Sequence, residues 1–474
     1  MSTAIHWFRR DLRLTDNTAL NAAAKAHERV VPVYVLSSWK GRHRWTGAPR
    51  QQFLCDSLGS LNTGLVQAGS QLLVRQGDPV AELLRLARES GATAIYANRD
   101  PDPHGRAVEE RLKAAALKQG IDVHLFKDAT LHEGAEVLSG TGNPFRVFTP
   151  YSKAWAKLPK ALPGGTLSRL DSPTGLASLP LPTLETWGIA PENLALPEAG
   201  ESAAQKRLER FLGGPVLRYA SRRDLPAEDG TSRISQDLRF GLLSIRHVFS
   251  KVQDCLKRAP TAAQAEVQIY INELCWREFY FQVLWHSPFV LEWEYQPAYR
   301  GLPWRDDADA FQKWCEGRTG FPIVDAGMRE LLHTGFMHNR VRMITAMFLT
   351  KDLHLDWRVG EQWFMQRLLD GEIASNNGGW QWSAGTGTDA APYFRIQNPW
   401  SQGARFDPAG DYIRRWVPEL RNVPAEMLHR PPAPGLKLAA AYPLPMLDHA
   451  AERATCMELY KTHLAKSKAG TPAL

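Results

Sequence analysis

The sequence predicts a parallel α/β domain, a long connector and a larger all-helical domain, in that order. Short β-rich runs alternate with amphipathic helical patterns near the start, eight prolines interrupt residues 150–200, and helical periodicity then dominates. Regular alternation of strands and helices is typical of a Rossmann-like sheet covered by helices. We therefore expect an α/β domain at 1–130, a linker at 131–202 and a helical domain at 203–474.

Five short runs rich in β-branched and aromatic residues are the predicted strands, at residues 4–8, 30–36, 71–74, 93–98 and 122–126. Helical patterns at 79–90 and 107–119 lie between them, and Gly120 ends the second pattern. Parallel strands need such crossover helices, so we expect the sheet to be parallel. The turn after the first strand lacks the pattern G-x-G-x-x-G, which disfavours a dinucleotide pyrophosphate site there.

The composition is that of an ordinary globular protein, with 44% hydrophobic and 23% charged residues in a chain of 474. A net charge of +7 permits a nucleic-acid partner. Residues 1–200 hold 23 Lys and Arg against 19 Asp and Glu (+4), and residues 201–474 hold 34 against 31 (+3). With no basic tail, a polyanion would bind a folded patch. Of the 16 tryptophans, 11 follow residue 200, so the helical domain is the aromatic one.

The sequence also indicates where the protein works. It has no run of 18 apolar residues, so we expect no membrane span and no membrane partner. The opening "MSTAIHWFRRDLRL" places charges where a signal peptide needs an apolar core, so we expect a cytoplasmic protein. The cysteines are scattered without a C-x-x-C pair, which argues against a zinc site or a disulfide framework; they are Cys55, Cys255, Cys275, Cys315 and Cys456. We therefore expect no metal.

Two stretches bear polar groups in patterns suited to ligands. "TSRIS" (231–235) puts three hydroxyls and an arginine together, which suits phosphates at a helix start; the alternative is a helix merely capped by Ser or Thr. In "NELCWREFYFQVLW", Glu273 shares one helical face with Trp276 and Arg277. That face is either a surface ion pair or the wall of a cavity that carries one carboxylate.

A third group of polar residues lies in the aromatic half of the chain. Segment 336–357 is apolar on one face, and its first turn holds Arg340 and Arg342, which are either solvated or part of a binding site. Asp370 and Glu372 then flank a glycine ahead of "NNGGWQW". Paired glycines permit the backbone to approach something flat, and tryptophans at i and i+2 cannot share a helix face.

Six longer motifs carry a family signature: "HWFRRDLRLTDNTAL" (6–20), "NELCWREFY" (272–280), "GRTGFPIVDAGMREL" (317–331), "MHNRVRMI" (337–344), "DWRVGEQWF" (356–364) and "NNGGWQWSAGTGTDAAPYFRIQNP" (376–399). Together they resemble the DNA photolyase/cryptochrome family over nearly the whole chain, with the closest likeness to class I cyclobutane pyrimidine dimer photolyases of bacteria. The resemblance implies an α/β antenna domain and a helical domain that binds FAD. It also implies a deoxyribodipyrimidine photo-lyase, a carbon–carbon lyase that uses light to split a flipped-out dimer in UV-damaged DNA.

The resemblance further implies a role for individual residues. The residues that would hold FAD are Tyr219, Thr231, Ser232, Arg233, Ile234, Ser235, Arg277, Arg342, Asp370, Glu372 and Asn376. Those that would contact the DNA are Glu273, Trp276, Asn339, Arg340, Met343, Trp382 and Gln402. The catalytic set is Glu273, which hydrogen-bonds the dimer, Asn376, which faces flavin N5, and the electron-passing chain of Trp380, Trp357 and Trp304. The family usually has Asp where this chain has Glu372.

Other features of the resemblance leave alternatives. A second, antenna chromophore is expected to be deazaflavin or methenyltetrahydrofolate, and residues 98–112 look nearer to deazaflavin-binding relatives. The alternative function is that of a cryptochrome-type blue-light photoreceptor, although plant-type cryptochromes typically have Asp at the position of Asn376. A six-four photolyase would have a histidine pair near 338–343, where this chain has only His338. We expect the protein to be a monomer.

Overall fold

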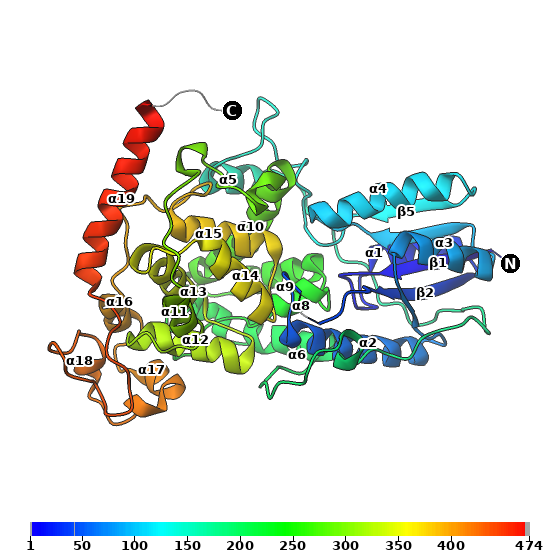
Figure 1. The fold of residues 1–474 in the computed structure, drawn as a ribbon. Helices are drawn as coiled ribbons and strands as arrows, with labels where there is room; N and C mark the ends of the chain where they lie inside the picture. The colour runs from blue at the N-terminus through cyan, green and yellow to red at the C-terminus, as the bar shows by residue number, and fades with distance from the viewer. Residues whose placement is uncertain (1, 42, 470–474) are drawn as a thin grey trace. The chain divides into compact units, whose positions relative to one another are not determined.

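Residues 2–41 and 43–469 are described by the computed structural model (Figure 1). The chain divides into two units. The first unit comprises Met1–Glu192, Pro197–Arg218 and Ser232–His286. The second unit comprises Asn193–Leu196, Tyr219–Thr231 and Ser287–Leu474. The chain thus enters the second unit three times, and each unit is held together by contacts between segments far apart in the sequence.

The first unit contains a five-stranded parallel sheet in the order β3-β2-β1-β4-β5. Its strands are β1 (Thr3–Phe8), β2 (Arg29–Leu36), β3 (Leu73–Gln76), β4 (Ala94–Asn98) and β5 (Asp122–Phe126). Ile5 of β1 pairs with Val31 on one side and with Ile95 on the other. All of β1 is buried, as a continuous apolar run in a parallel sheet requires. The predicted parallel α/β fold is confirmed.

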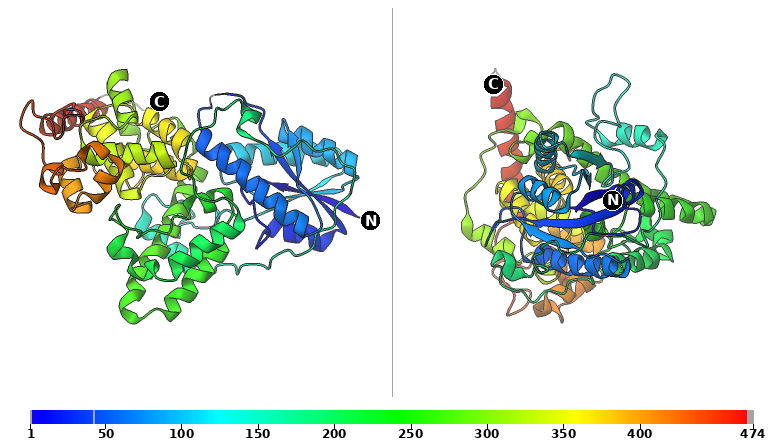
Figure 2. Two further views of the ribbon diagram at one scale, coloured as in Figure 1. Left: turned by 90° about the horizontal axis from the view of Figure 1, so that it is seen from below. Right: turned by 90° about the vertical axis from the view of Figure 1, so that its right-hand side faces the viewer.

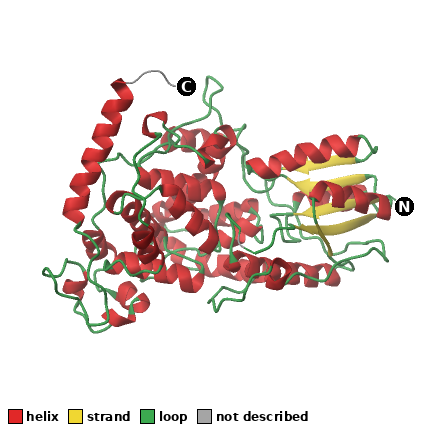
Figure 3. Ribbon diagram, viewed as in Figure 1, coloured by secondary structure: helices red, strands yellow, loops and turns green. Residues whose placement is uncertain are grey.

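Four helices accompany the sheet: α1 (Thr18–Ala26), α2 (Ala48–Gln67), α3 (Pro79–Ser90) and α4 (Pro103–Leu117). Helices α3 and α4 pack together, α3 against the strands from β1 to β3 and α4 against β5, while α1 packs against β1, β4 and β5. Because the direction of the right-handed crossovers reverses after β3, the helices cover both faces of the sheet, as Figures 2 and 3 show. Helix α4 begins four residues before the predicted 107–119, because Pro103 starts it.

The third strand lies two residues later than predicted. We expected residues 71–74, whereas β3 spans Leu73–Gln76. The backbone N–H of Leu72 donates to Asn62 Oδ1 at 2.9 Å, so the ladder with β2 begins only at Leu73. A side chain from α2 therefore sets the start of this strand, which no local pattern of the sequence indicates.

The proline-rich connector differs from the expectation at its start. Residues Phe148–Lys157 form helix α5, because the side chains of Tyr151 and Trp155 fall on one buried face and Pro150 lies in the first turn, where no backbone donor is needed. The Trp155 indole N–H donates to Glu278 Oε2 at 2.7 Å. Further on, the connector is tied to the α/β domain by its backbone: Leu179 N donates to the carbonyl of Val74 at 2.9 Å.

The rest of the first unit is helical. Its other helices are α6 (Glu201–Leu212), α8 (Ser235–Phe240), α9 (Ile245–Arg258) and α10 (Thr261–His286). Helix α10 packs against α5 and α9. Ser244 caps α9, since its hydroxyl accepts hydrogen bonds from the backbone N–H groups of Arg246 and His247.

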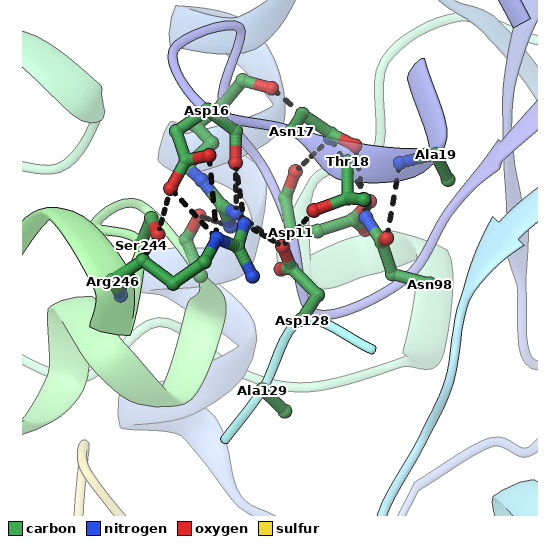
Figure 4. A network of polar contacts seen from close by, with 12 residues as sticks. Asp11, Asp16, Asn17, Thr18, Ala19, Asn98, Asp128, Ala129, Ser244 and Arg246 are labelled. Atoms are coloured by element: carbon green, nitrogen blue, oxygen red, sulfur yellow. Dashed lines mark hydrogen bonds and ion pairs between the residues drawn. The ribbon is translucent and has the colours of Figure 1, made fainter. Parts of the chain in front are cut away.

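A buried polar network joins the loop after β1 to α9 within the first unit (Figure 4). Asp128 Oδ1 accepts from Arg13 Nη2 at 2.6 Å and from Arg246 Nη2 at 2.7 Å. Asp16 accepts from Arg246 Nε at 3.1 Å and from the hydroxyl of Ser244. Each of these four charged side chains is at most 7% exposed. The network leaves the cap of α9 and the first loop with one fixed arrangement.

Asp11 lies in the same loop and shows how the network handles a buried carboxylate. Burial raises its pKa, but the contact with His6, a hydrogen bond from the backbone N–H of Arg9 and the charge of Arg13 together lower it more, so the pKa is about 2. Asn98 Nδ2 also donates to Asp11 Oδ2 at 2.7 Å. The carboxylate is therefore ionised and held from two strands, β1 and β4.

The second unit is helical among its described residues. It contains α7 (Tyr219–Arg222), α11 (Ala308–Cys315), α12 (Pro322–Thr334), α13 (Asn339–Met347), α14 (Trp357–Arg367), α15 (Ile373–Ala384), α16 (Pro399–Phe406), α17 (Asp411–Trp416), α18 (Ala425–Leu428), α19 (His449–Ala469) and a π-helical turn, η5 (Phe348–Asp352). Short 3-10 turns occur in the second unit at Pro288–Leu291, Pro297–Tyr299 and Pro418–Leu420, and in the first unit at Leu184–Trp187 and Pro215–Arg218. In the part of the chain that is described, each helix is too short or too polar to cross a bilayer.

Candidate functional site

Helix α15 carries the two tryptophans of "NNGGWQW" on opposite sides. Residues two apart on a helix are about 200° apart around its axis. Trp380 is 2% exposed and packs edge-to-face against Phe364 at 5.0 Å and against Trp314 at 6.1 Å between ring centroids. Trp382 is only half-buried. The same helix therefore places the Trp380 ring in a buried core and the Trp382 ring on a side that is partly exposed.

A glycine lets α14 approach the Trp380 ring closely. A Cβ placed on Gly360 would lie 2.1 Å from Trp380 Cη2, so only glycine fits there. Trp357 lies one turn before Gly360 on α14 and is fully buried in the same core as Trp380. Trp304 packs against this core but is half-buried, with its ring 6.4 Å from that of Tyr460. The three tryptophans named by the resemblance thus share one aromatic core and grade from buried to partly exposed.

Asn376 and Gly379 lie one turn apart on α15. Asn376 Nδ2 donates to the backbone carbonyl of Glu361 at 3.1 Å, which leaves its amide oxygen to face elsewhere. A Cβ on Gly379 would meet no atom within 4 Å, so space lies open over this part of the helix. Asn377 is buried and donates to Glu361 Oε1 at 2.9 Å. Asn377 therefore fixes the helix, while open space lies over Gly379, one turn from Asn376.

An ion pair precedes α15 in the same unit. Arg342 Nη2 lies 2.9 Å from Asp370 Oδ2 and 3.1 Å from Oδ1, and its Nε donates to the carbonyl of Met337 at 2.7 Å. Glu372 occupies the cap position of α15, where its carbonyl accepts from Asn376 N at 2.8 Å. The side chain of Asp370 is 7% exposed, so the pair is a fixed element rather than a solvated one.

The first turn of α13 presents the residues that the resemblance assigns to DNA. Asn339 is exposed, and Arg340 and Met343 are half-buried beside it. Arg340 Nη2 lies 2.8 Å from Asp224 Oδ2, and its guanidinium carbon lies 4.4 Å from the Phe406 ring centroid. The alternative that the two arginines of this segment are simply solvated is therefore wrong. Gln402 of α16 is half-buried.

The "TSRIS" stretch is not a capped helix start of the ordinary kind. Helix α8 begins at Ser235 with Ile234 in the cap position, and no side chain caps it. Arg233 has a φ of 52°, a left-handed conformation that is uncommon for a residue other than glycine. Ser232 hydrogen-bonds the buried hydroxyl of Tyr270 in the first unit. The hydroxyl groups of this stretch therefore do not cap the helix, and that of Ser232 binds Tyr270 instead.

Tyr219 and Thr231 fall in the second unit. Tyr219 is buried, and the guanidinium of Arg223 lies 5.3 Å from its ring centroid. Thr231 is half-buried.

Helix α10 presents Glu273, Trp276 and Arg277 on its half-buried face, while Leu274, Cys275 and Glu278 are buried. Trp276 stacks flat on Phe148 of α5, with ring centroids 3.6 Å apart and planes at 7°. Arg277 Nη1 donates to the carbonyl of Ala129 at 2.7 Å, and its guanidinium lies 4.7 Å from the Phe281 centroid. The aromatic ring on this face is thus held rigidly with one side covered.

Several residues of the site escaped the sequence analysis. Phe148 backs Trp276, and Gly360 admits the Trp380 ring. Gln381 fixes α15 from the other side, since its Nε2 donates to the carbonyls of Val290 and Trp293 at 3.0 and 3.1 Å. The i, i+4 spacing of Asn377 and Gln381 was a signal for this last role, because two amides on one helix face commonly bind backbone.

The α/β sheet and the aromatic helical core define a two-domain flavoprotein of the photolyase type. A family model described as DNA photolyase matches residues 4–168, and one described as the FAD binding domain of DNA photolyase matches residues 270–462. The deoxyribodipyrimidine photo-lyase of Halobacterium salinarum is 40% identical over 96% of this chain and 98% of its own length. That of Escherichia coli is 36% identical over 97% of this chain and 99% of its own. The chain belongs to the DNA photolyase family.

Solved structures agree with this assignment. A bacterial class III photolyase from Agrobacterium tumefaciens has a TM-score of 0.91 and 36% identity, with 98% of each chain covered. An archaeal photolyase from Sulfolobus tokodaii, described with two FAD molecules, has a TM-score of 0.84 and 31% identity over 97% of this chain and 100% of its own. A cryptochrome from Synechocystis sp. has a TM-score of 0.87 and 30% identity over 97% of this chain and 99% of its own. The predicted family and fold class are confirmed.

Proposed function

We propose that this chain repairs cyclobutane pyrimidine dimers in UV-damaged DNA with blue light and bound FAD, the reaction of a deoxyribodipyrimidine photo-lyase. The observation that supports this most is the division of α15, where a buried aromatic core surrounds Trp380, open space lies over Gly379, and Trp382 is half-buried. Relatives that bear this enzyme name align with nearly the full chain.

FAD fits the residues present. Open space over Gly379 suits a flat ring that lies against the helix backbone, and Asn376 lies one turn before Gly379 on the same helix. Bound FAD supplies the light-driven electron transfer that no side chain can perform. The residues proposed to hold it are Tyr219, Thr231, Ser232, Arg233, Ile234, Ser235, Arg277, Arg342, Asp370, Glu372 and Asn376. Among them, the Arg342–Asp370 pair gives a fixed dipole, and Arg233 provides backbone strained into a shape that suits phosphate.

The dimer is proposed to leave the duplex and enter a pocket with aromatic walls, because its ring bonds are inaccessible inside the base stack. Trp276 and Trp382 stack on it, Glu273 accepts a hydrogen bond from a base N–H, and Asn339, Arg340, Met343 and Gln402 contact the damaged strand. The splitting is redox-neutral: one electron enters the dimer, the two bonds of the cyclobutane ring that join the bases break, and the electron returns. The residues bind and orient, and they undergo no net change.

Trp380, Trp357 and Trp304 are proposed to pass electrons from the surface of the protein to the cofactor when the cofactor is oxidised. Their gradation from buried to half-buried gives a path from core to surface.

We also propose that the α/β domain carries an antenna chromophore, deazaflavin or methenyltetrahydrofolate. The protein is proposed to act as a monomer in the cytoplasm, where its cysteines stay as thiols.

The second candidate function is blue-light signalling. The likeness to the Synechocystis cryptochrome favours it, since the fold is shared. The two functions differ in whether DNA is changed, so repair is the discriminating readout.

The test uses an oligonucleotide with one thymine dimer and protein whose FAD has been reduced chemically. Blue light should restore intact thymines, and an identical sample in darkness should not change. Binding of the dimer without light-dependent restoration would favour the photoreceptor instead. Equal restoration in the dark would contradict the proposal, because the electron transfer would then not depend on excitation.

A further inference from the structure

The buried ring of Trp357 contacts two opposite charges in the second unit. Its indole Nε1 donates to Glu294 Oε1 at 3.2 Å. The guanidinium carbon of Arg358 lies 4.6 Å from the centroid of the same ring, and Arg358 Nη2 lies 3.0 Å from Glu294 Oε2. Glu294 is 1% exposed and Trp357 is fully buried. One carboxylate therefore touches both the ring and the cation that covers it.

The chain around Glu294 holds this carboxylate in place. The loop that carries it is clamped to α15, because Gln381 Nε2 donates to the carbonyl of Trp293 at 3.1 Å and the N–H of Tyr295 donates to Gln381 Oε1 at 2.8 Å. Arg300 Nε donates to the carbonyl of Glu294 at 3.3 Å. Bonds on both sides of Glu294 thus leave its side chain little freedom to turn away from Trp357.

Arg358, whose guanidinium lies over the ring, is fixed as firmly. Its Nε donates to the carbonyl of Glu292 at 2.9 Å, and its Nη1 lies 3.0 Å from Asp356 Oδ1. Burial lowers the pKa of Arg358, and Glu294 with Asp356 raises it more, so the guanidinium remains charged. Because Asp356 also caps α14 through the N–H of Arg358, helix start and cation form one rigid piece.

These charges act on any electron that leaves Trp357. A tryptophan that loses an electron becomes a cation whose N–H is a much stronger hydrogen-bond donor than before. A carboxylate bonded to that N–H stabilises the cation, whereas a guanidinium over the ring destabilises it. The Glu294 side chain is only 2% exposed, whereas that of Arg358 is 24% exposed, so solvent screens the guanidinium more than the carboxylate. The carboxylate bonds the ring directly, while the guanidinium lies further out and is itself paired. The carboxylate therefore dominates.

We propose that Glu294 sets how readily Trp357 gives up its electron, with Arg358 in opposition. This rests on the proposed relay of tryptophans. In the step concerned, one electron moves from Trp357 to the oxidised ring of Trp380: Trp380 is reduced to its neutral form, Trp357 becomes the cation, and no bond breaks. Trp304 then returns an electron to Trp357, and a small thiol in solution is the final reductant. Glu294 is a positioning residue that acts through Trp357.

The test compares Glu294→Gln with Arg358→Gln. Glutamine keeps an acceptor for the indole N–H and removes the negative charge, so the electron transfer from Trp357, followed by transient absorption of the tryptophan cations, should slow about tenfold or more. Arg358→Gln should transfer the electron faster than the wild type, because it removes the charge that opposes the tryptophan cation. Glu330→Gln is the matched control, since Glu330 is another buried carboxylate of this unit, bonded to Tyr412 Oη at 2.6 Å, and should leave the rate unchanged.

A readout without cofactor accompanies the kinetics. In the FAD-free protein, the indole N–H resonance of Trp357 should move upfield in Glu294→Gln, because a neutral acceptor makes a weaker hydrogen bond than a carboxylate. An unchanged resonance would contradict the contact itself. This measurement needs only the folded chain.

The failures are distinguishable. If Trp357→Phe abolishes flavin photoreduction and Glu294→Gln keeps the wild-type rate, the role of Glu294 is wrong and the relay stands. If Trp357→Phe leaves photoreduction intact, the relay is wrong, and the role of Glu294 with it. If Glu294→Gln does not fold, Arg358→Gln decides alone, since a tenfold slowing there would reverse the sign of the proposed effect.

Discussion

Two buried regions, one in each unit, are built from different kinds of side chain. In the first unit, Asp16 and Asp128 meet Arg13 and Arg246 in a network where each carboxylate binds an arginine (Figure 4). In the second unit, the core around Trp380 is built from aromatic rings. Both regions are buried, yet one is held together by ion pairs and the other by the packing of aromatic rings.

The difference teaches what each region is suited to do. Paired charges with every partner in place fix a single arrangement and resist titration, as the pKa of about 2 for Asp11 shows. A buried aromatic core screens charge only weakly. A single carboxylate such as Glu294 therefore has a large influence on the energy of a cation formed on a neighbouring tryptophan. The first region is suited to hold elements together, and the second to pass electrons.

The largest expected effect is in the ionic network. Asp128→Ala would leave the guanidinium groups of Arg13 and Arg246 without their shared partner in a buried site, which should lower the free energy of unfolding by about 3–5 kcal/mol. Glu110→Ala is the control, because its ion pair with Lys113 is exposed and should contribute less than about 1 kcal/mol. Urea unfolding measures both. Equal losses in the two variants would contradict the contrast between buried and exposed pairs.

A buried lysine extends the comparison to the second unit. Lys351 Nζ donates to the carbonyl of Ala384 at 2.7 Å and lies 3.7 Å from the Tyr460 ring centroid, so its partners are a dipole and an aromatic face. Burial lowers its pKa from 10.5 to about 8. Between pH 8 and 10.5 the unfolded chain binds a proton that the folded chain has released, so the free energy of unfolding rises with pH across this window.

The expected rise from Lys351 is about 2 kcal/mol between pH 8 and 10. It is measured as the difference between the wild type and Lys351→Met, which cancels the titration of tyrosines. A difference that stays constant over this range would show that the ammonium is not desolvated as the structure indicates.

Two glycines sharpen the contrast between packed and open space within the second unit. Gly360→Ala would push a Cβ into the Trp380 ring and should destabilise the protein by about 1–3 kcal/mol. Gly379→Ala meets no neighbour and should stabilise the FAD-free protein by up to about 1 kcal/mol, since alanine favours a helix. Thermal unfolding gives both signs.

The same Gly379→Ala variant tests the use of the open space. If a flavin ring lies there, the added methyl should lower the FAD content of the purified protein even though the chain alone is more stable. Full FAD content would place the ring elsewhere.

The sequence predicts much of this structure. The parts that it does not predict depend on contacts between residues that are not neighbours in the sequence. Local periodicity predicted the parallel sheet and the helices, because strand and helix patterns are written in neighbouring residues. Local periodicity does not predict α5, because the prolines around it indicate a connector. Trp155 of α5 is held by a hydrogen bond to Glu278, which lies more than a hundred residues away in the sequence. Local periodicity also placed β3 two residues early, because Asn62 takes the hydrogen bond of Leu72.

The site shows the same limit. The resemblance named the tryptophans and the Arg342–Asp370 pair, whose roles remain predictions. The structure adds that Arg340 is paired with Asp224, and that Glu294 bonds Trp357. Neither Asp224 nor Glu294 stands in a recognisable pattern, because each acts through a contact that exists only after folding.

The central claim is that the two faces of α15 do different work, and two substitutions test it directly. Trp380→Phe should abolish light-driven reduction of oxidised FAD and leave affinity for dimer-containing DNA near normal, with repair restored by chemical reduction. Trp382→Ala should leave photoreduction intact and weaken binding of the damaged duplex by about 1–3 kcal/mol through lost stacking. Photoreduction is followed by absorbance under blue light and affinity by titration with a labelled dimer oligonucleotide. Equal impairment of the same step by both substitutions would contradict the claim.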